Sequence, residues 1–514
     1  MSADLDLLAD RHFRPDPQGV LAPKGEGKCG RVLVTVTQAL AGTPAGQHLA
    51  WMLVNQLARQ FGVVAEIALN IANAPPLENT AAFGTKDTLR DTLEECVRLV
   101  AGKHIGVLAK FEDTYRFDLH IVVGVSNGRE LADRTLCIYA DGWRWYVGNG
   151  KNMPTLIPLS SLSFGPYMAA SFAAGEVYKN LRKILPNKGS YVTECFGSAW
   201  TMSLGEGWDS LVDGPGLNEI PVLPHFYFAG AGAVAQAAAL TIGSSRINGA
   251  ASAVDHDKLD VTNDNRYVLS TLDDEEKSKA ELLSSYLTDK AFPCHHAPVK
   301  WSAYVSTNGK TAMNQEIAAL EQQHRFPIVL SCVDKNLPRH EIQTLLPRII
   351  IGGSTDGLVA KVSTFYLGHE AACLKCFNPV EDRNISIQQN REKLVNMSHE
   401  QRNEWCRERG ISVDALEHFL SKAECGKLSE ADLERFAEGS PDMSVGFVSV
   451  TAGVLLSAQL IRVIVLGIDK TTVSGHTIAV TFAKVGIRYL KSGPETSCNC
   501  RTQLRSTWHR LWEK

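Results

Sequence analysis

Two stretches of the chain share one pattern of apolar and polar positions. Each has a short apolar run, a turn containing glycine, a helix-length segment and a second apolar run; the stretches are 31–71 and 226–254. Short apolar runs bounded by turn residues are typical of buried strands, and the longer segments have the apolar content of buried helices. We therefore predict two α/β halves, each built on a strand–helix–strand unit of the Rossmann type.

The first half continues with further elements of the same kind. We predict a helix over DTLRDTLEECVRLV, a strand over HIVVGVSNG and a second helix around PYMAASFAAGEVYKNL, whose small residues suit close packing against a sheet. Its first turn keeps Gly42 and Gly46 but has no GxGxxA sequence and no acidic cluster after it. This half is expected to have the framework of the fold without its chemistry.

Two connecting segments have their own character. Residues 204–224 are rich in Gly, Pro and Asp, which indicates a linker. In the segment 291–305, Cys294, His295 and His296 are adjacent. Adjacent side chains point in different directions and rarely bind one metal together, so we expect a loop leading into a strand.

The chain becomes polar and strongly charged between Val380 and Met443, with helical periodicity in EQRNEWCRERG and SVDALEHFLSKA. We interpret this region as an insertion carried on the second half. The apolar run that follows, Phe447–Gly467, is long enough to cross a bilayer, but Gln459 and Arg462 interrupt it. We predict a buried helix and no membrane partner.

Composition narrows the class of protein. The 514 residues are 44% hydrophobic and carry a net charge of −4, with Lys and Arg dispersed along the chain. Nucleic-acid binding needs a basic face, so no nucleic-acid partner is expected. The acidic N-terminus lacks the apolar core of a secretory signal, so we expect a cytoplasmic protein whose 12 cysteines are thiols or metal ligands.

The turn after Phe228 carries the first chemical signal. Gly230, Gly232 and Ala235 form a GxGxxA turn, which lets backbone amides and a helix N-terminus approach phosphate oxygens. Asp255 follows roughly 20 residues later, where a dinucleotide fold places its ribose-binding acid. A nicotinamide dehydrogenase is one interpretation, but it has no need of the further acids, Asn and Arg that come next. That cluster favours a nucleoside triphosphate.

The ordered set of polar residues after the turn resembles a family signature. Asp255, Asp257, Asn263, Arg266 and Lys279 are similar to the adenylation motif of ubiquitin-activating enzymes and of bacterial sulfur-carrier adenylyltransferases of the ThiF and MoeB types. Farther on, PIVLSCVDKNLPRHE resembles the family's strand that ends in a magnesium-binding aspartate, here Asp334, with Arg339 after it. GGSTDGLVAKVSTFYLGHEAACLKCF resembles its glycine-rich strand and first CxxC.

The resemblance implies ATP and magnesium as cofactors and a role for each residue. Asp255 would hold the ribose hydroxyls, Arg266 and Lys279 would neutralise the triphosphate, and Asn263 would be a polar contact beside them. Asp334 would hold magnesium, which prefers carboxylate and phosphate oxygen. Lys335 stands where relatives commonly have Asn. From the first half, Arg11 and Arg14 are conceivable contacts of ATP, but no sequence feature assigns either.

The resemblance also places a catalytic cysteine in the insertion, where Cys406 and Cys425 lie. Cys425 is our first candidate, because Gly426 follows it, Lys422 and Lys427 flank it, and a thiolate needs a nearby cation or helix N-terminus. Cys406 adjoins Trp405 within a predicted helix and is expected to pack. A third interpretation is that the insertion holds no catalytic cysteine.

A metal site is predicted from the remaining cysteines. Cys373 and Cys376 form a CxxC pair, and Cys498 and Cys500 form a CxC pair near the end of the chain. Four thiolates satisfy tetrahedral zinc with no open position, so the site would be structural. The resembling family carries a structural zinc in the same order.

These expectations give one organisation of the chain. In order, it comprises an inactive adenylation-like domain (1–203), a linker (204–224), the first part of an active adenylation domain (225–379), a catalytic-cysteine insertion (380–443), and the end of the active domain with a zinc-binding tail (444–514).

The leading functional hypothesis is an activating enzyme that adenylates a ubiquitin-like protein, forms a thioester with it and hands it to a conjugating enzyme. The layout is most like the activating enzymes of bacterial ubiquitin-like conjugation operons, including Bil-type antiphage systems. The alternative is a sulfur-carrier adenylyltransferase without thioester transfer. A non-catalytic scaffold is a third hypothesis, which the intact set of acidic and basic residues disfavours.

Overall fold

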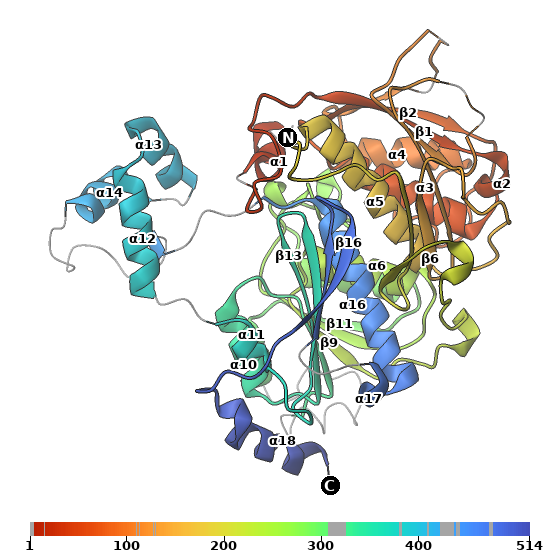
Figure 1. Cartoon of the computed structure of the whole chain (residues 1–514). Helices are drawn as coiled ribbons and strands as arrows, with labels where there is room; N and C mark the ends of the chain where they lie inside the picture. The colour runs from red at the N-terminus through yellow and green to blue at the C-terminus, as the bar shows by residue number, and fades with distance from the viewer. Residues whose placement is uncertain are drawn as a thin grey trace. The chain divides into compact units, whose positions relative to one another are not determined.

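The computed structural model divides into two compact units, Met1–Phe377 with Asp442–Lys514, and Asn378–Pro441 (Figure 1). It describes residues 5–14, 16–108, 110–112, 114–126, 128, 130–306, 325–379, 383–408, 411–421, 436–437, 443–471 and 476–513. The larger unit holds two sheets with their helices.

The first sheet has eight strands in the order β3-β2-β1-β4-β5-β6-β7-β8. The strands from β3 to β5 run parallel, and those from β5 to β8 are antiparallel. The strands are β1 Gly30–Val36, β2 Val64–Ile71, β3 Gly106–Leu108, β4 Leu119–Val123, β5 Thr135–Asp141, β6 Arg144–Gly148, β7 Glu194–Ser198 and β8 Ser203–Gly205. The helices are α1 Leu5–Phe13, α2 Gln38–Ala41, α3 Pro44–Leu57, α4 Leu89–Ala101 and α5 Phe164–Arg182.

The second sheet also has eight strands, in the order β11-β10-β9-β12-β13-β14-β15-β16. Its strands are β9 Phe226–Ala229, β10 Ala251–Val254, β11 Cys294–Ala297, β12 Ile328–Ser331, β13 Ile349–Asp356, β14 Val359–Phe365, β15 His476–Thr481 and β16 Gly486–Lys491. Its helices are α6 Ala233–Ser244, α7 Lys279–Asp289, α8 Trp301–Ser306, α10 Asn336–Thr344, α11 Leu374–Phe377, α16 Gly446–Leu466, α17 Ile468–Thr471 and α18 Gln503–Trp512.

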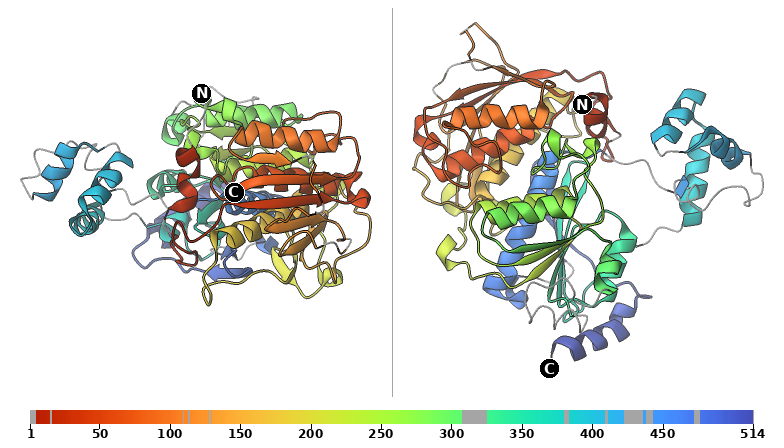
Figure 2. Two further views of the ribbon diagram at one scale, coloured as in Figure 1. Left: turned by 90° about the horizontal axis from the view of Figure 1, so that it is seen from above. Right: turned by 180° about the vertical axis from the view of Figure 1, so that it is seen from behind.

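The two sheets are topological copies of each other. Counted from the first strand of each half, both have the strand order 3-2-1-4-5-6-7-8, and both change from parallel to antiparallel pairing at the fifth strand. Helix α5 holds the place in the first half that α16 holds in the second, and these two helices pack on each other where the halves meet. Figure 2 shows the red-to-yellow first half beside the green-to-blue second half. The prediction of two Rossmann-like halves is confirmed.

Helix α16 is apolar around most of its circumference, and most of its residues are buried. It packs against α6, α5, β13 and β14. Glycine makes the closest of these approaches possible, since a Cβ atom at Gly453 would lie 2.5 Å from the Cβ atom of Ala237. The helix is long and apolar enough to cross a membrane, but 83% of its most apolar window is buried inside the protein. The prediction of a buried core helix over this run is confirmed.

The smaller unit is helical where it is described, with α12 Arg383–Val395, α13 His399–Glu408 and α14 Val413–Leu420. Ser412 begins α14 as its N-cap and accepts a hydrogen bond from the amide of Ala415. The core contains Trp405 and the stacked rings of Phe419 and Phe436, whose centroids are 3.8 Å apart. A core this small depends on its aromatic side chains for most of its buried apolar area.

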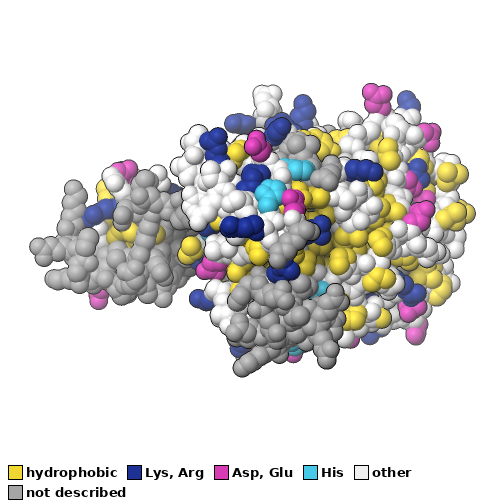
Figure 3. Space-filling model, turned by 90° about the horizontal axis from the view of Figure 1, so that it is seen from below, with side chains coloured by type: hydrophobic (Ala, Val, Ile, Leu, Met, Phe, Trp, Pro, Cys, Tyr) yellow, Lys and Arg dark blue, Asp and Glu magenta, His cyan; other side chains and the backbone are white. Residues whose placement is uncertain are grey.

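The surface is mixed in character on the face seen from below. Figure 3 shows charged side chains of both signs with His among them near the centre of that face, and hydrophobic side chains spread over the rest. This mixture agrees with the dispersed charge of the sequence.

Candidate functional site

The turn between β9 and α6 lies against the neighbouring strand end. Gly230 has a φ of +94°, and a Cβ atom there would lie 2.9 Å from the carbonyl oxygen of Cys332. Glycine is therefore required at this position for both conformation and space. Gly232 caps α6 without a side-chain hydrogen bond, so the leading amides of the helix lack a side-chain acceptor. Such a turn can receive phosphate oxygens.

Asp255 follows β10 and closes the same turn. Its carboxylate accepts a hydrogen bond of 2.6 Å from the amide of Ala231 and one of 2.9 Å from the amide of Asp257. Burial raises the pKa of Asp255, while these two hydrogen bonds and Lys279 act to lower it. The parallel pairing of β9 and β10 explains the contact, because their carboxyl ends meet at one edge of the sheet.

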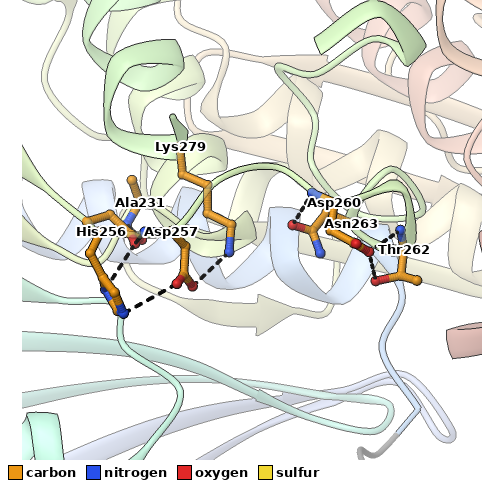
Figure 4. Close-up of polar contacts among 8 residues, drawn as sticks. Ala231, His256, Asp257, Asp260, Thr262, Asn263 and Lys279 are labelled. Carbon is orange, nitrogen blue, oxygen red and sulfur yellow. Dashed lines mark hydrogen bonds and ion pairs between the residues drawn. The ribbon is translucent and has the colours of Figure 1, made fainter. Parts of the chain in front are cut away.

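Figure 4 shows His256, Asp257 and Lys279 gathered near Ala231, whose amide donates to Asp255. Lys279 is the first residue of α7, and its Nζ atom donates to Asp257 Oδ2 at 3.0 Å. Its side chain is only 11% exposed. Burial alone would lower the pKa of Lys279, but Tyr267 and Asp257 outweigh burial and raise it. Lys279 is thus a fixed ammonium group next to two carboxylates.

Arg266 lies on the segment 261–270, which we call the nucleotide loop. Its guanidinium donates to the Thr262 carbonyl and to Asn265 Oδ1, each at 2.8 Å, and its Cζ atom lies 5.3 Å from the centre of the Tyr267 ring. Lys279 Nζ lies 5.6 Å from the same centre. One buried aromatic ring therefore holds both cations predicted to contact phosphate.

Arg11 adds a third cation from the first half of the chain. Helix α1 packs against the 3-10 turn Val261–Asn263 of the nucleotide loop. Burial and the nearby Arg266 lower the pKa of Arg11 to about 10. Like charges on Arg11 and Arg266 repel each other, and an anion bound between them would relieve that repulsion.

The sequence alone did not distinguish Arg11 from Arg14 as a possible contact of ATP. The two differ only once α1 is seen to pack on the nucleotide loop. In the structure Arg14 Nε donates to Asp10 at 2.7 Å. Tyr267, the aromatic contact of both Arg266 and Lys279, was not selected at all. Its signal was its position directly after Arg266 in the motif.

Asn263 is buried and takes part in the loop's own structure. Its Oδ1 atom accepts from the amide of Asp260 at 3.3 Å, while Asp260 accepts from the amide of Thr262, which together form a capping box. Figure 4 shows this group as separate from the Asp257–Lys279 group. The structure places Asn263 as a residue that shapes the loop carrying Arg266.

Asp334 lies in the loop after β12, next to the β9 turn. The amide of Cys332 donates to the carbonyl of Ala229 at 2.8 Å, so the two loops leave the sheet side by side. Asp334 is exposed, and it acts to raise the pKa of Arg339, which burial lowers. Arg339 in turn donates to the Val333 carbonyl at 3.2 Å. An exposed carboxylate at this edge is accessible to a magnesium ion carried by phosphates.

The four predicted metal cysteines come together. Sulfur–sulfur distances are 3.7 Å for Cys373–Cys376, 3.8 Å for Cys373–Cys498 and 3.5 Å for Cys376–Cys500, and all four sulfurs lie within 4.8 Å of one another. Tetrahedral zinc with bonds of about 2.3 Å would hold its sulfurs about 3.8 Å apart. The cluster could therefore bind a metal such as zinc.

The two candidate nucleophiles differ in what the structure says of them. Cys406 is 2% exposed and belongs to the core of the smaller unit with Trp405 and Phe436. This position agrees with a packing role. Cys425, the first candidate, lies outside the described residues.

Three comparisons relate the chain to known proteins. A model of the ThiF family matches residues 225–502. The uncharacterized protein y4jF of Sinorhizobium fredii is 24% identical over 348 residues, which cover 67% of this chain and 60% of that protein. This chain thus spans about 60% of the length of its curated relative.

Among solved structures, the crystal structure of E. coli MccB with MccA-N7isoASN is 14% identical, with a TM-score of 0.36 and coverage of 55% of this chain and 68% of that one. The structure of SeMet PaaA is 13% identical, with a TM-score of 0.33 and coverage of 54% and 66%. The ThiF model extends over more than half of the sequence, from the β9 strand to the second cysteine pair, and the chain therefore belongs to the ThiF family.

Proposed function

We propose that this protein adenylates the C-terminal carboxylate of a ubiquitin-like protein and then carries the acyl group on a cysteine as a thioester. Membership of the ThiF family supports an ATP-dependent adenylating enzyme. One observation carries the nucleotide part of the proposal: Asp255 binds the amide of the Gly230 turn, Lys279 pairs with Asp257 beside it, and the nearby nucleotide loop carries Arg266.

In the first step a carboxylate oxygen attacks the α-phosphorus of ATP. A carboxylate–phosphorus bond forms, the bond to the bridging oxygen of the β-phosphate breaks, and pyrophosphate leaves with that electron pair. The protein's part is positioning and stabilisation of charge. Asp255 would hold the ribose hydroxyls, and its bond to the Ala231 amide already fixes its carboxylate beside the turn.

The charge balance of the site supports a polyanionic ligand. Arg266 and Lys279 contact the Tyr267 ring, and Arg11 is close enough to interact electrostatically with Arg266. Asp257 is the acid paired with Lys279. Displacement of Asp257 by a triphosphate would free the ammonium group for phosphate oxygen. Asp334 would hold the magnesium that accompanies the triphosphate, and magnesium would supply further neutralisation of the leaving pyrophosphate.

In the second step a thiolate sulfur attacks the acyl carbon. The carbon–sulfur bond forms, the carbon–oxygen bond to AMP breaks, and AMP leaves. We assign this sulfur to Cys425, since Cys406 is enclosed among aromatic rings. The thioester would then pass to the cysteine of a conjugating enzyme. The layout of two halves with a short helical insertion is like that of activating enzymes from bacterial ubiquitin-like conjugation systems, including antiphage systems of the Bil type. Such a protein would act in the cytoplasm.

The test is ATP–pyrophosphate exchange in the presence of magnesium and candidate ubiquitin-like proteins. Arg266→Ala and Asp334→Ala should each lower the exchange rate by at least about 100-fold, because each removes charge stabilisation that the transition state requires. Arg348→Ala is the control, since Arg348 is exposed in the same half. Exchange that is unchanged in both site variants would remove these residues from the site. Absence of exchange in the native chain would overturn the proposed function.

A further inference from the structure

The back of the nucleotide loop is held by side chains of the first half. Arg59 follows α3 and donates from Nη1 to the Asp264 carbonyl at 2.8 Å and from Nη2 to the Ser270 carbonyl at 2.6 Å. Asn55, on the last turns of α3, donates from Nδ2 to the Val268 carbonyl at 3.1 Å. Three carbonyls of one irregular loop are thus bound by two residues that lie more than two hundred positions earlier in the chain.

Arg59 and Asn55 also fix each other. Arg59 Nε donates to Asn55 Oδ1 at 2.7 Å, so the guanidinium is held at three of its nitrogens. Arg59 is 1% exposed and Asn55 is fully buried. A buried guanidinium is costly unless its donors are satisfied, and a satisfied one has little freedom to move. This pair is therefore a rigid bracket rather than a loose surface contact.

The front of the same loop faces the candidate nucleotide site. Arg266 and Tyr267 lie between the bracketed carbonyls of Asp264 and Val268. Tyr267 is 5% exposed, contacts Arg266 and Lys279 with its ring, and would lie 3.4 Å from a Cβ atom built at Gly232. A shift of the loop backbone would therefore move the two predicted phosphate contacts and the aromatic ring between them.

We propose that Arg59 and Asn55 are positioning residues through which the inactive half sets the geometry of the nucleotide loop. They touch neither ATP nor the reacting carboxylate, and act by holding the backbone on both sides of Arg266 and Tyr267. The proposal rests on the proposed function, and it gives the first half a defined task in ATP use. Loss of either residue should raise the KM for ATP and lower kcat/KM, because misplacement of binding groups by about 1 Å can cost two orders of magnitude in rate.

The chain offers a control in the residue directly after Arg59. Gln60 is 3% exposed and donates from Nε2 to the Ala174 carbonyl at 2.9 Å, a contact within the first half. Asn55→Leu and Gln60→Met each remove one buried hydrogen bond from a side chain to a carbonyl, and Asn55→Leu also removes the acceptor of Arg59 Nε. A merely structural role predicts a lower melting temperature in both variants and a rise in the KM for ATP in neither.

The experiment measures the KM for ATP in pyrophosphate exchange, together with the melting temperature, for the full-length chain. Arg59→Met should raise the KM for ATP by about 10-fold or more, and Asn55→Leu by about 3-fold, since both loosen a loop that binds phosphate. Arg59→Lys keeps the charge but lacks the two terminal guanidinium nitrogens that bind two carbonyls at once. Its KM for ATP should lie between those of the native chain and Arg59→Met. Gln60→Met should lower the melting temperature and keep the KM within about 2-fold of native.

An unchanged KM in Arg59→Met and Asn55→Leu would overturn the proposal, as would an equal rise in Gln60→Met. Hydrogen exchange separates this outcome from failure of the proposed function. If the native chain catalyses no pyrophosphate exchange, faster amide exchange over 264–270 in the Asn55 variant, but not in the Gln60 variant, still supports the bracket. Equal protection in both variants contradicts it.

Discussion

Asp264 shows how one buried side chain of the nucleotide loop links the structure to pH. Burial raises its pKa to about 6, against the lowering effects of Arg59 and of the Ser270 hydroxyl, with Asp274 and Glu275 also acting to raise it. In the unfolded chain the Asp264 carboxyl group has about its ordinary pKa of 3.8, so it loses its proton at a lower pH there than in the folded chain. Stability is therefore expected to fall as the pH rises from about 4 to about 6, by up to about 3 kcal/mol, and to remain lower above that window.

Asp264→Asn removes this titration from the folded and the unfolded chain. The free energy of unfolding of the variant, minus that of the native chain, should rise by up to about 3 kcal/mol between pH 4 and pH 7. Urea denaturation at several pH values measures the difference, in which the other titrating groups cancel. A difference that stays flat over this range for Asp264→Asn would contradict the predicted titration.

At the scale of elements, the cysteine cluster joins the C-terminal helix to the second sheet. Cys498 and Cys500 precede α18, whose Trp508 is fully buried and donates from Nε1 to the Pro347 carbonyl at 2.9 Å. Cys498→Ser should reduce bound metal from about one zinc per chain to a small fraction, because it removes one of four thiolates. The melting temperature should fall by about 2–4 °C for each kcal/mol by which the free energy of unfolding decreases.

Metal analysis and a thermal melt of the same samples check this prediction, and Trp508 should become accessible to quenchers as α18 loosens. Cys294→Ser is the control, since Cys294 is a buried cysteine outside the cluster. Full zinc content in Cys498→Ser would show that the four thiolates are not the ligands.

Elements whose signal is local could be predicted from the sequence. The apolar run of β9, its glycine turn and the acid after β10 are neighbours in the chain, and the structure brings Gly230 and Asp255 together through the Ala231 amide. The prediction of a loop leading into a strand over 291–305 agrees with the structure at its start, since residues 291–293 lead into the strand β11, with Cys294 buried and His296 exposed. The helix α8 that follows was not predicted.

Features that depend on how the halves meet could not be predicted. Asn55 is one of several polar residues of α3 and Arg59 follows the helix, so nothing in the sequence singles out the pair. Only the packing of this segment behind the nucleotide loop gives them carbonyl partners. Arg11 likewise needs α1 to dock on that loop. The strands β5, β6 and β7 were not assigned either, because their residues alternate little and are buried on both faces.

At the scale of the whole molecule, the proposed chemistry divides between the two compact units. Each candidate contact of the nucleotide lies in the unit Met1–Phe377 with Asp442–Lys514, and both candidate nucleophiles lie in the unit Asn378–Pro441. The described part of the smaller unit has its own core around Phe419 and Phe436. Adenylation and thioester formation should therefore be separable by removing the smaller unit.

Replacement of residues 378–441 by a flexible Gly/Ser linker should leave ATP–pyrophosphate exchange within about 5-fold of native, because the nucleotide contacts remain. The same variant should form no thiol-sensitive adduct with the ubiquitin-like protein on a non-reducing gel with magnesium and ATP. Full-length Cys425→Ala is the matched control and should likewise exchange without forming the adduct, whereas Cys406→Ala should keep it.

Each other outcome assigns the chemistry differently. An adduct that survives removal of the smaller unit would place the nucleophile elsewhere in the chain. Exchange lost with the unit would contradict the assignment of all candidate nucleotide contacts to the larger unit. Native exchange without any adduct in the full-length chain would favour the sulfur-carrier adenylyltransferase over the activating enzyme, because adenylation then ends without a thioester.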